Sequence, residues 1–353
     1  MGFLYNKLLK PLLFTDYDGL PVSGKHAVKE ASAILIDRAR PDPFEKAGGF
    51  REVPVHFYYP EPDDKDPERF PLVVFSHGAF GFYKSNYSTY AELASNGYVV
   101  AALDHPHHAF FTKNTRGKRV FVDKAFFRAA TGRGGELDAQ KEYELYSGWV
   151  ALRTSDVSFV IDALKAAAQS GETDSSWFVS EPEGEAARSV PQLLDASRIG
   201  VMGHSLGGAA AVEIGRQRRD VSAVIDLDGT MLGEYTGAEN GKLTFREDPF
   251  PVPVLEFCGW DQYNKVLEFL AQGECYPNDV LIRSAAAGFS TTLRGTKHMD
   301  FTDLPLFSPF LGKKLGKGER DTAEALQIVN SLALEFLNCY LKGEGVFTVE
   351  PIY

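Results

Sequence analysis

The chain has 353 residues, of which 44% are hydrophobic and 24% are charged, the balance of an ordinary soluble globular protein. Its net charge of −11 argues against a general nucleic-acid binder and provides no electrostatic attraction to anionic membranes. The three cysteines, an odd number without a C-x-x-C motif, favour a reducing compartment. We therefore expect a cytoplasmic protein, or a secreted one if a signal peptide has been removed.

The N-terminal stretch MGFLYNKLLKPLLF (1–14) is mildly amphipathic and is interrupted by Pro11. It lacks the apolar core and cleavage site of a signal peptide, and no run in the chain approaches the ~20 apolar residues of a membrane span. We expect a short helix that covers the core rather than a membrane anchor. Residues 1–50 are predicted to form an N-terminal extension, with a strand at 33–38.

From residue 52 onward, apolar strand patterns alternate with helical patterns. The predicted strands are 52–60, 72–78, 98–105, 198–203, 221–229, 253–259 and 289–295. The predicted helices are 85–97, 155–169, 209–217 and 321–343. This alternation predicts a single α/β domain over residues 1–353, with a mostly parallel central sheet and helices on both faces. Catalytic groups on such a sheet lie beyond the carboxyl ends of the strands.

Two segments break the alternation. Residues 106–150 are rich in aromatic residues and contain an obvious loop, TGRGGELD (131–138), whereas residues 171–196 are polar and acidic. Inserts of this size in such a fold are usually caps or lids over the site, so we predict cap insertions at 106–150 and 171–196.

The motif GHSLGG (203–208) lies between a predicted strand and an alanine-rich helix. A strand, a sharp turn with Ser205 at its apex and a helix together make the geometry of a nucleophile elbow. Gly203 and Gly207 flank the serine because a side chain at either position would clash with the neighbouring strand or helix. Ser205 is therefore the candidate nucleophile.

A neutral serine requires a base, and in folds with such an elbow the chain order is serine, acid, histidine. Of the eight histidines only His298 follows Ser205, so we predict His298 as the base by elimination. Two strand-end carboxylates, Asp228 and Asp261, are candidates for the acid that orients it. Topology slightly favours Asp261, and Asp226, inside the earlier strand, is interpreted as a structural carboxylate.

The oxyanion hole of such a site needs two backbone N–H groups. One comes from the residue after the nucleophile, Leu206. The other comes from the loop SHGAFG (76–81), where we assign Ala79, with Phe80 as the alternative. We expect His77 to support this loop rather than to act as the base.

The stretch LDHPHHAFF (103–111) contains three histidines, but no carboxylate or cysteine spacing completes a zinc site. We predict a loop at the mouth of the pocket and no metal or cofactor. The nearby aromatic residues are candidates for binding the substrate: Phe80 and Phe82, and also Phe110 and Phe111.

Several stretches together resemble the platelet-activating-factor acetylhydrolase family of α/β-hydrolases, in its plasma type and bacterial relatives. They are DRARPDPF, REVPVHFYYP, VVFSHGAFGFYKSNYSTYAELASNGYVVAALDHPHH, RIGVMGHSLGGAAA, AVIDLDGTM and GTKHMDFTDL, from about residue 37 to 305. The resemblance implies the α/β-hydrolase fold and a triad of Ser205, Asp228 and His298, with Ala79 and Leu206 as oxyanion donors. It thus favours Asp228 over Asp261 as the acid.

The sequence therefore predicts a serine ester hydrolase that cleaves short acyl esters, such as the sn-2 acetyl or oxidised acyl group of a phospholipid. The alternatives with the same triad are a general carboxylesterase, a polyester or dienelactone hydrolase, and a peptidase. A non-catalytic hydrolase fold that binds a ligand is the alternative of another class. We expect a small ester or phospholipid as the partner, and neither nucleic acid nor stable membrane insertion.

Overall fold

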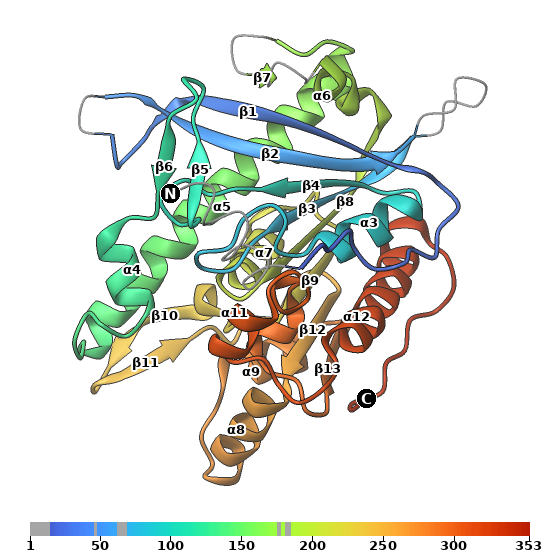
Figure 1. Ribbon diagram of the computed structural model, residues 1–353. Coiled ribbons are helices and arrows are strands. Elements are labelled where there is room, and N and C mark those ends of the chain that lie inside the picture. The colour runs from blue at the N-terminus through green and yellow to red at the C-terminus, as the bar shows by residue number, and fades with distance from the viewer. Residues whose placement is uncertain (1–14, 46–47, 62–68, 175–177, 181–184) are drawn as a thin grey trace.

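The structure is a computed structural model that describes residues 15–45, 48–61, 69–174, 178–180 and 185–353. The helix predicted at 1–14 lies outside the described residues. A nine-stranded sheet runs through the described chain, and helices cover both of its faces (Figure 1). The predicted fold class, a mostly parallel sheet between helical layers, is confirmed.

The sheet has the strand order β13-β12-β9-β8-β3-β4-β2-β1-β7. The strands from β13 to β4 pair in parallel; they are β3 (Phe70–Ser76), β4 (Val99–Leu103), β8 (Leu194–His204), β9 (Ala223–Leu227), β12 (Val254–Gly259) and β13 (Gly288–Leu293). The remaining strands pair antiparallel at one side; they are β2 (Phe50–Pro60), β1 (Val28–Pro41) and β7 (Phe178–Ser180). Each predicted strand falls on one of these. The predicted N-terminal extension contributes β1, which is part of the central sheet.

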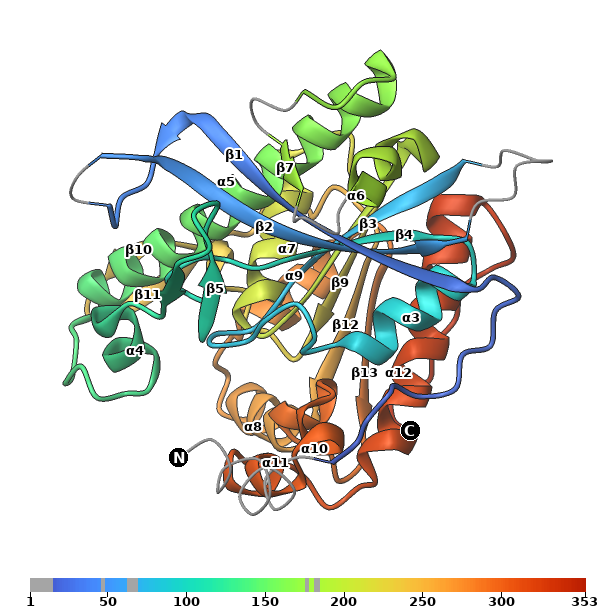
Figure 2. The same ribbon diagram turned by 45° about the horizontal axis from the view of Figure 1, so that its top comes forward.

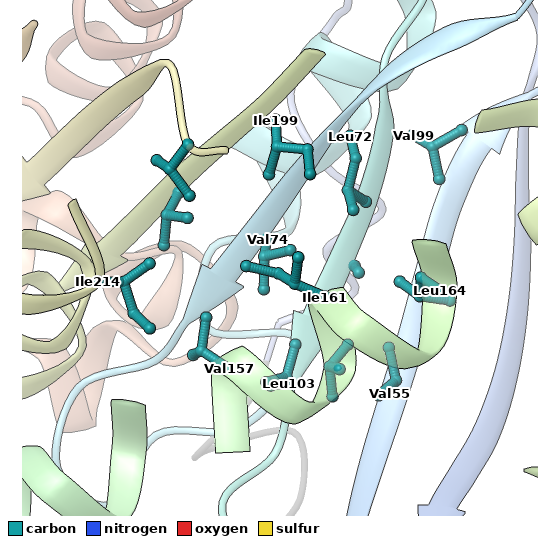
Figure 3. Packing of buried hydrophobic residues seen from close by; sticks show 14 of the residues in the cluster. Val55, Leu72, Val74, Val99, Leu103, Val157, Ile161, Leu164, Ile199 and Ile214 are labelled. Carbon is teal, nitrogen blue, oxygen red and sulfur yellow. The ribbon is translucent and has the colours of Figure 1, made fainter. Parts of the chain in front are cut away.

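The strands are buried on both faces because helices cover both sides. Leu72 and Val74 of β3 belong to one apolar cluster, and the alternate residues Val73 and Phe75 belong to the other, as the pleat of a strand requires. The first face is covered by α5 (Ala139–Ser170) and α7 (Leu206–Gln217), and the second by α3 (Tyr87–Ser95) and α12 (Thr322–Leu337). Figure 3 shows side chains of α5 packed against the strands. This double burial makes the sheet a rigid base for the loops at its edge.

Helix α5 is much longer than predicted. It begins at Ala139, where the Asp138 side chain accepts a hydrogen bond from the Lys141 N–H, and it ends at Gly171, whose φ is 76°. The prediction started at residue 155 because only the second half of the helix meets the sheet and shows the apolar spacing of a core helix.

The first predicted cap insertion, 106–150, contains a hairpin, a short helix and the start of α5. The hairpin consists of β5 (Phe111–Lys113) and β6 (Arg119–Phe121), and α4 spans Lys124–Ala130. The predicted loop at 131–138 is confirmed. A second hairpin, not predicted, is formed by β10 (Tyr235–Glu239) and β11 (Lys242–Phe245).

The second predicted cap insertion, 171–196, has a different place in its described part. It forms β7, α6 (Glu185–Ser189), a 3-10 helix (Val190–Leu193) and the start of β8. Strand β7 pairs with β1 at the edge of the sheet, five strands from β8, which leads to Ser205. These described residues extend the sheet at that edge, and the role of the insertion as a lid stays a prediction.

The C-terminal part adds short helices and then α12. Helix α8 (Trp260–Ala271) directly follows β12, whereas α10 (Leu304–Phe307) and α11 (Pro309–Lys314) pack against each other at the bottom of the view in Figure 2. A further helix, α9, spans Pro277–Ser284, and a π-helix (Asn338–Lys342) extends α12 to Gly343, the predicted stop. None of the helices that the structure describes is long and apolar enough to cross a bilayer.

Candidate active site

Ser205 lies at the apex of a tight turn between β8 and α7. Its φ of 56° and ψ of −123° place a non-glycine residue in a strained region of the backbone, as a nucleophile elbow requires. A Cβ atom on Gly203 would overlap the Gly207 carbonyl, and one on Gly207 would lie 2.7 Å from the His77 carbonyl oxygen. The predicted strand–turn–helix and the reason for its two glycines are confirmed.

Asp228 and His298 meet beside this turn. Asp228 directly follows β9 and is buried, and His298 follows β13 in a 3-10 helix (His298–Phe301). The Asp228 Oδ2 atom lies 2.6 Å from His298 Nδ1, and its Oδ1 atom accepts a hydrogen bond of 2.6 Å from the Gly259 N–H. Because a carboxylate at Nδ1 keeps the proton there, the Nε2 atom of His298 is left to accept a proton.

The electrostatic environment of His298 favours its protonated form. Burial alone would lower the pKa of His298, but the hydrogen bond and the charge of Asp228 raise it above the ordinary value of 6.5, and the charge of Asp261 adds to this. The side chain of His298 is still 44% exposed, so a substrate can reach it. A histidine whose basicity is raised by a neighbouring carboxylate suits proton transfer from a serine.

The other two carboxylates lie in different settings. Asp261 is in the first turn of α8, where its Oδ1 atom accepts a hydrogen bond from the Gln262 N–H. Asp226 is fully buried inside β9, and burial, with the nearby charges of Glu256 and Asp228, raises its pKa well above 3.8. The structure therefore brings Asp228, and not Asp261, into hydrogen-bond contact with His298.

The loop after β3 passes next to the elbow. A Cβ atom built on Gly78 would lie 3.2 Å from the Cβ atom of Ser205. The Phe80 N–H donates to the His108 carbonyl at 3.0 Å, so it is already engaged, whereas no hydrogen bond joins the Ala79 N–H to another described residue. The Leu206 N–H is the first of α7 and has no acceptor within the helix. Ala79 and Leu206 thus offer the two N–H groups.

His204, to which the sequence analysis gave no role, packs between the loop and the base. Its Nε2 atom donates to the His298 carbonyl at 3.1 Å, and the two rings are 4.5 Å apart. Burial, followed by the effect of His298, lowers the pKa of His204 well below 6.5, so it is neutral. Only its place inside the elbow motif could have drawn attention to it.

The three histidines of LDHPHH do not form a metal site. His105 contacts Asp156 through Nδ1 at 2.9 Å and Ser76 through Nε2 at 2.9 Å, while His107 and His108 stack on aromatic rings. Burial, with the charge of Arg153, lowers the pKa of His105 to about 3. No group of three or more metal-binding side chains occurs among the residues that the structure describes.

The aromatic residues predicted to bind substrate lie in different surroundings. Phe80 packs against Phe126 of α4, with ring centres 5.5 Å apart, and Phe82 is partly exposed. Phe110 and Phe111 are 59% and 41% exposed and contact each other. The ring of Phe80 thus joins the loop at 76–81, called the oxyanion loop below, to the first cap insertion.

A cavity of about 830 Å³ lies between α4 and α5. Its lining includes the side chains of Phe126, Tyr146 and Trp149, but neither Ser205 nor His298. Phe126 also belongs to the apolar cluster that includes Leu206. The segment 106–150 therefore lies beside the elbow, and its role as a lid stays a prediction.

A mostly parallel sheet, a nucleophile elbow after one strand and an Asp–His pair after later strands define an α/β-hydrolase fold. The family model described as "Platelet-activating factor acetylhydrolase, isoform II" matches residues 60–347. The chain belongs to this family, which confirms the resemblance of its motifs.

Known relatives agree with this membership. The chain is 26% identical over 298 residues to the platelet-activating factor acetylhydrolase of Cavia porcellus, covering 78% of this chain and 59% of that protein. It is 28% identical over 300 residues to the one of Gallus gallus, covering 78% and 63%. The chain thus spans about three fifths of the length of these relatives.

A solved structure shares the fold. The ferulic acid esterase from Streptomyces cinnamoneus superimposes with a TM-score of 0.65 at 22% identity, covering 92% of this chain and 93% of that chain. At this identity the likeness concerns the fold alone.

Proposed function

We propose that the protein is a serine ester hydrolase with Ser205 as nucleophile, His298 as base and Asp228 as the acid. The observation that carries the proposal is the 2.6 Å contact between His298 Nδ1 and a buried Asp228, next to a serine held at a φ of 56°. Family membership supports the same chemistry.

The reaction has two steps. His298 Nε2 takes the proton of Ser205 as Oγ attacks the ester carbonyl, and the Ala79 and Leu206 N–H groups stabilise the oxyanion. The C–O bond to the alcohol then breaks, and His298 protonates the leaving oxygen. Water enters, gives a proton to His298 and attacks the acyl-enzyme. The bond from Ser205 Oγ to the acyl carbon then breaks, His298 returns the proton to Oγ, and the acid is released. Neither a metal nor a cofactor takes part in this proposal.

The proposed substrate is a short acyl ester, in particular the sn-2 acetyl or oxidised acyl group of a phospholipid. The support is the name of the relatives, platelet-activating factor acetylhydrolase, at 26% and 28% identity. A general carboxylesterase, or a polyester or dienelactone hydrolase, would use the same residues and is distinguished by its substrates.

The test of the triad is the hydrolysis of p-nitrophenyl acetate, butyrate and octanoate by wild type, Ser205→Ala, Asp228→Asn and Asp261→Asn. We expect Ser205→Ala to be inactive and Asp228→Asn to lose about 10⁴-fold in kcat, because the wrong histidine tautomer is then held. Asp261→Asn is the matched control and should stay within a few fold of wild type. If the Asp261 variant collapses and the Asp228 variant does not, the assignment of the acid is wrong.

The test of the substrate compares a 2-acetyl phospholipid with its long-chain 2-acyl counterpart. Faster hydrolysis of the acetyl compound supports the proposal. Hydrolysis of p-nitrophenyl esters with none of either phospholipid would identify a general esterase. A folded wild-type protein that is inert on all of these esters would favour a non-catalytic binding protein.

A further inference from the structure

Arg153 of α5 contacts the three residues that precede Ala79, at the end of β3 and the start of the following loop. Its side chain is fully buried. The Nη1 atom donates to the His77 carbonyl at 2.6 Å and to Ser76 Oγ at 3.3 Å, and the Nη2 atom donates to the Gly78 carbonyl at 3.4 Å. The partners of this guanidinium group are therefore concentrated at the end of β3 and the start of the loop.

The side chain of His77 also contacts the Gly78 carbonyl. The backbone N–H of His105 donates to His77 Nε2 at 3.2 Å, so Nε2 is an acceptor. Burial, together with the charge of Arg153, lowers the pKa of His77 well below 6.5, so the ring is neutral and its proton is on Nδ1. That Nδ1–H then donates to the Gly78 carbonyl at 2.6 Å.

These contacts hold the peptide unit that ends in the Ala79 N–H, together with the Gly81 N–H, which donates to the Gly78 carbonyl at 3.1 Å. The Gly78 carbonyl and the Ala79 N–H belong to one planar trans peptide, in which the two groups point in opposite directions. Holding the oxygen toward His77 and Arg153 turns the N–H away from them. Gly78 also lies next to Ser205, since a Cβ atom on it would be 3.2 Å from the serine Cβ.

The partners of Arg153 are unusual for a buried arginine. The nearby carboxylate of Asp156 is bonded to Arg51 and His105 instead. Arg153 therefore has carbonyl, hydroxyl and imidazole partners, the last being His108 Nδ1 at 3.2 Å. Burial lowers the pKa of Arg153 to about 9, partly offset by the charge of Asp156, so it stays charged at neutral pH.

We propose that Arg153 is a positioning residue of the oxyanion hole, which orients and polarises the Gly78–Ala79 peptide so that the Ala79 N–H meets the developing oxyanion. A donor that is already oriented before the reaction stabilises the transition state without reorganisation, and hydrogen bonding to the carbonyl strengthens the N–H of the same peptide. This inference rests on the proposed esterase function.

The first test compares Arg153→Met and Arg153→Lys with wild type on p-nitrophenyl acetate. Losing a whole oxyanion donor costs about 10²–10³ in kcat, so a donor that is present but misoriented should cost roughly 10- to 100-fold, with KM within about twofold. Lysine supplies a single ammonium group in place of the two-pronged guanidinium group and should recover part of the lost kcat. The affinity for a trifluoromethyl ketone analogue of the oxyanion should fall in parallel with kcat/KM.

The matched control is Arg216→Met. Arg216 is also largely buried, and its guanidinium group bonds to Glu234 and to the carbonyls of Asp248 and Pro249, with no bond to the oxyanion loop. This variant should lose stability and keep its kcat. The pH midpoint of kcat/KM should be unchanged in the Arg153 variants, because Asp228 and His298 are untouched.

If Arg153→Met does not fold, two variants of His77 test whether the orientation of the Gly78–Ala79 peptide controls the rate. The amide nitrogen of asparagine occupies the place of His77 Nδ1, and the amide of glutamine occupies the place of Nε2. We expect His77→Asn to keep the bond to Gly78 and most of the activity, and His77→Gln to lose about tenfold.

Two results with an active wild type would overturn this inference and leave the proposed function intact. One is an unchanged kcat in folded Arg153→Met and Arg153→Lys. The other is equal activity in the two His77 variants. A wild type that hydrolyses no ester would overturn the proposed function, and this inference with it.

Discussion

Gly207→Ala is the substitution that most directly tests the close packing of the elbow. Gly207 is the second residue of α7, and its Cα faces the end of β3. An added Cβ would overlap the Ser76 carbonyl oxygen and lie 2.5 Å from the carbonyl carbon, whereas ordinary contacts begin at 3.4 Å. Because the oxygen is the nearer of the two atoms, the start of α7 and the end of β3 would have to separate by more than 1 Å to reach an ordinary contact.

This separation acts on both halves of the oxyanion hole, because Leu206 begins α7 and the loop with Ala79 continues β3. A misplacement of about 1 Å costs roughly 10²-fold in rate, and overpacking a core costs about 1–3 kcal/mol. We therefore expect kcat/KM for p-nitrophenyl acetate to fall about 100-fold and the thermal midpoint to fall by a few degrees. Initial rates and thermal unfolding measure the two effects separately.

Gly148→Ala is the matched control for this experiment. Gly148 lies inside α5, and a Cβ atom on it would meet nothing within 4 Å. The same change there should raise stability by about 0.4–1 kcal/mol, since alanine favours a helix, and leave kcat/KM within twofold. A Gly207→Ala variant as active and as stable as the Gly148 control would refute the packing argument.

Three further outcomes are expected. The kcat/KM of the proposed esterase should rise with pH as His298 loses its proton, with a midpoint above 6.5, and Asp228→Asn should lower that midpoint because the carboxylate raises the pKa of His298; a midpoint unmoved by the substitution would contradict the coupling. Asp156→Asn should cost about 3–5 kcal/mol in urea unfolding, since it breaks the fully buried ion pair of Arg51 and leaves that guanidinium group only its longer ion pair of 3.3 Å with Asp42, and a loss below 1 kcal/mol would argue against it. Asp300→Ala should lower the thermal midpoint and kcat together, because Asp300 accepts hydrogen bonds from Lys297, Gly318 and Thr322 and ties the His298 loop to α12; a change in neither would show that the loop is held elsewhere.

The sheet and the elbow were predictable because their sequence signals are local. Strands buried on both faces are continuous apolar runs, and a serine between two glycines at a strand–helix junction has one common structural meaning. The β10–β11 hairpin has an equally local signal, the dipeptide Asn240-Gly241. Asn240 and Gly241 connect its strands with φ values of 50° and 75°, as a two-residue hairpin turn requires.

The acid could not be fixed from the residues alone. Asp228 and Asp261 follow neighbouring parallel strands, and a Cβ atom on Gly259 would lie 3.0 Å from the first carboxylate and 3.2 Å from the second. The difference is that Asp228 follows its strand at a φ of 52°, whereas Asp261 has entered a helix. A backbone angle of this kind has no signature in strand periodicity.

The place of the second predicted cap insertion could not be derived from the sequence for a related reason. A polar, acidic segment between a helix and a strand indicates an insertion, but its composition does not say over which edge of the sheet it lies. Strand β7 pairs with Leu35 and its neighbours in β1, and this long-range contact decides its place. Composition alone therefore identified an insertion and not its position.

The residues around the oxyanion loop show why sequence reasoning stops at the residues that contact the reacting atoms. Arg153 is 76 positions from the carbonyl of His77 that it binds, and in the sequence it is one arginine in a helix. Its burial, and the engagement of Asp156 with Arg51 and His105, are what separate it from an ordinary ion pair. If the Ala79 N–H acts as proposed, catalytic orientation in this protein depends on α5 as well as on the loop, and the same helix also lines the cavity beside Phe126.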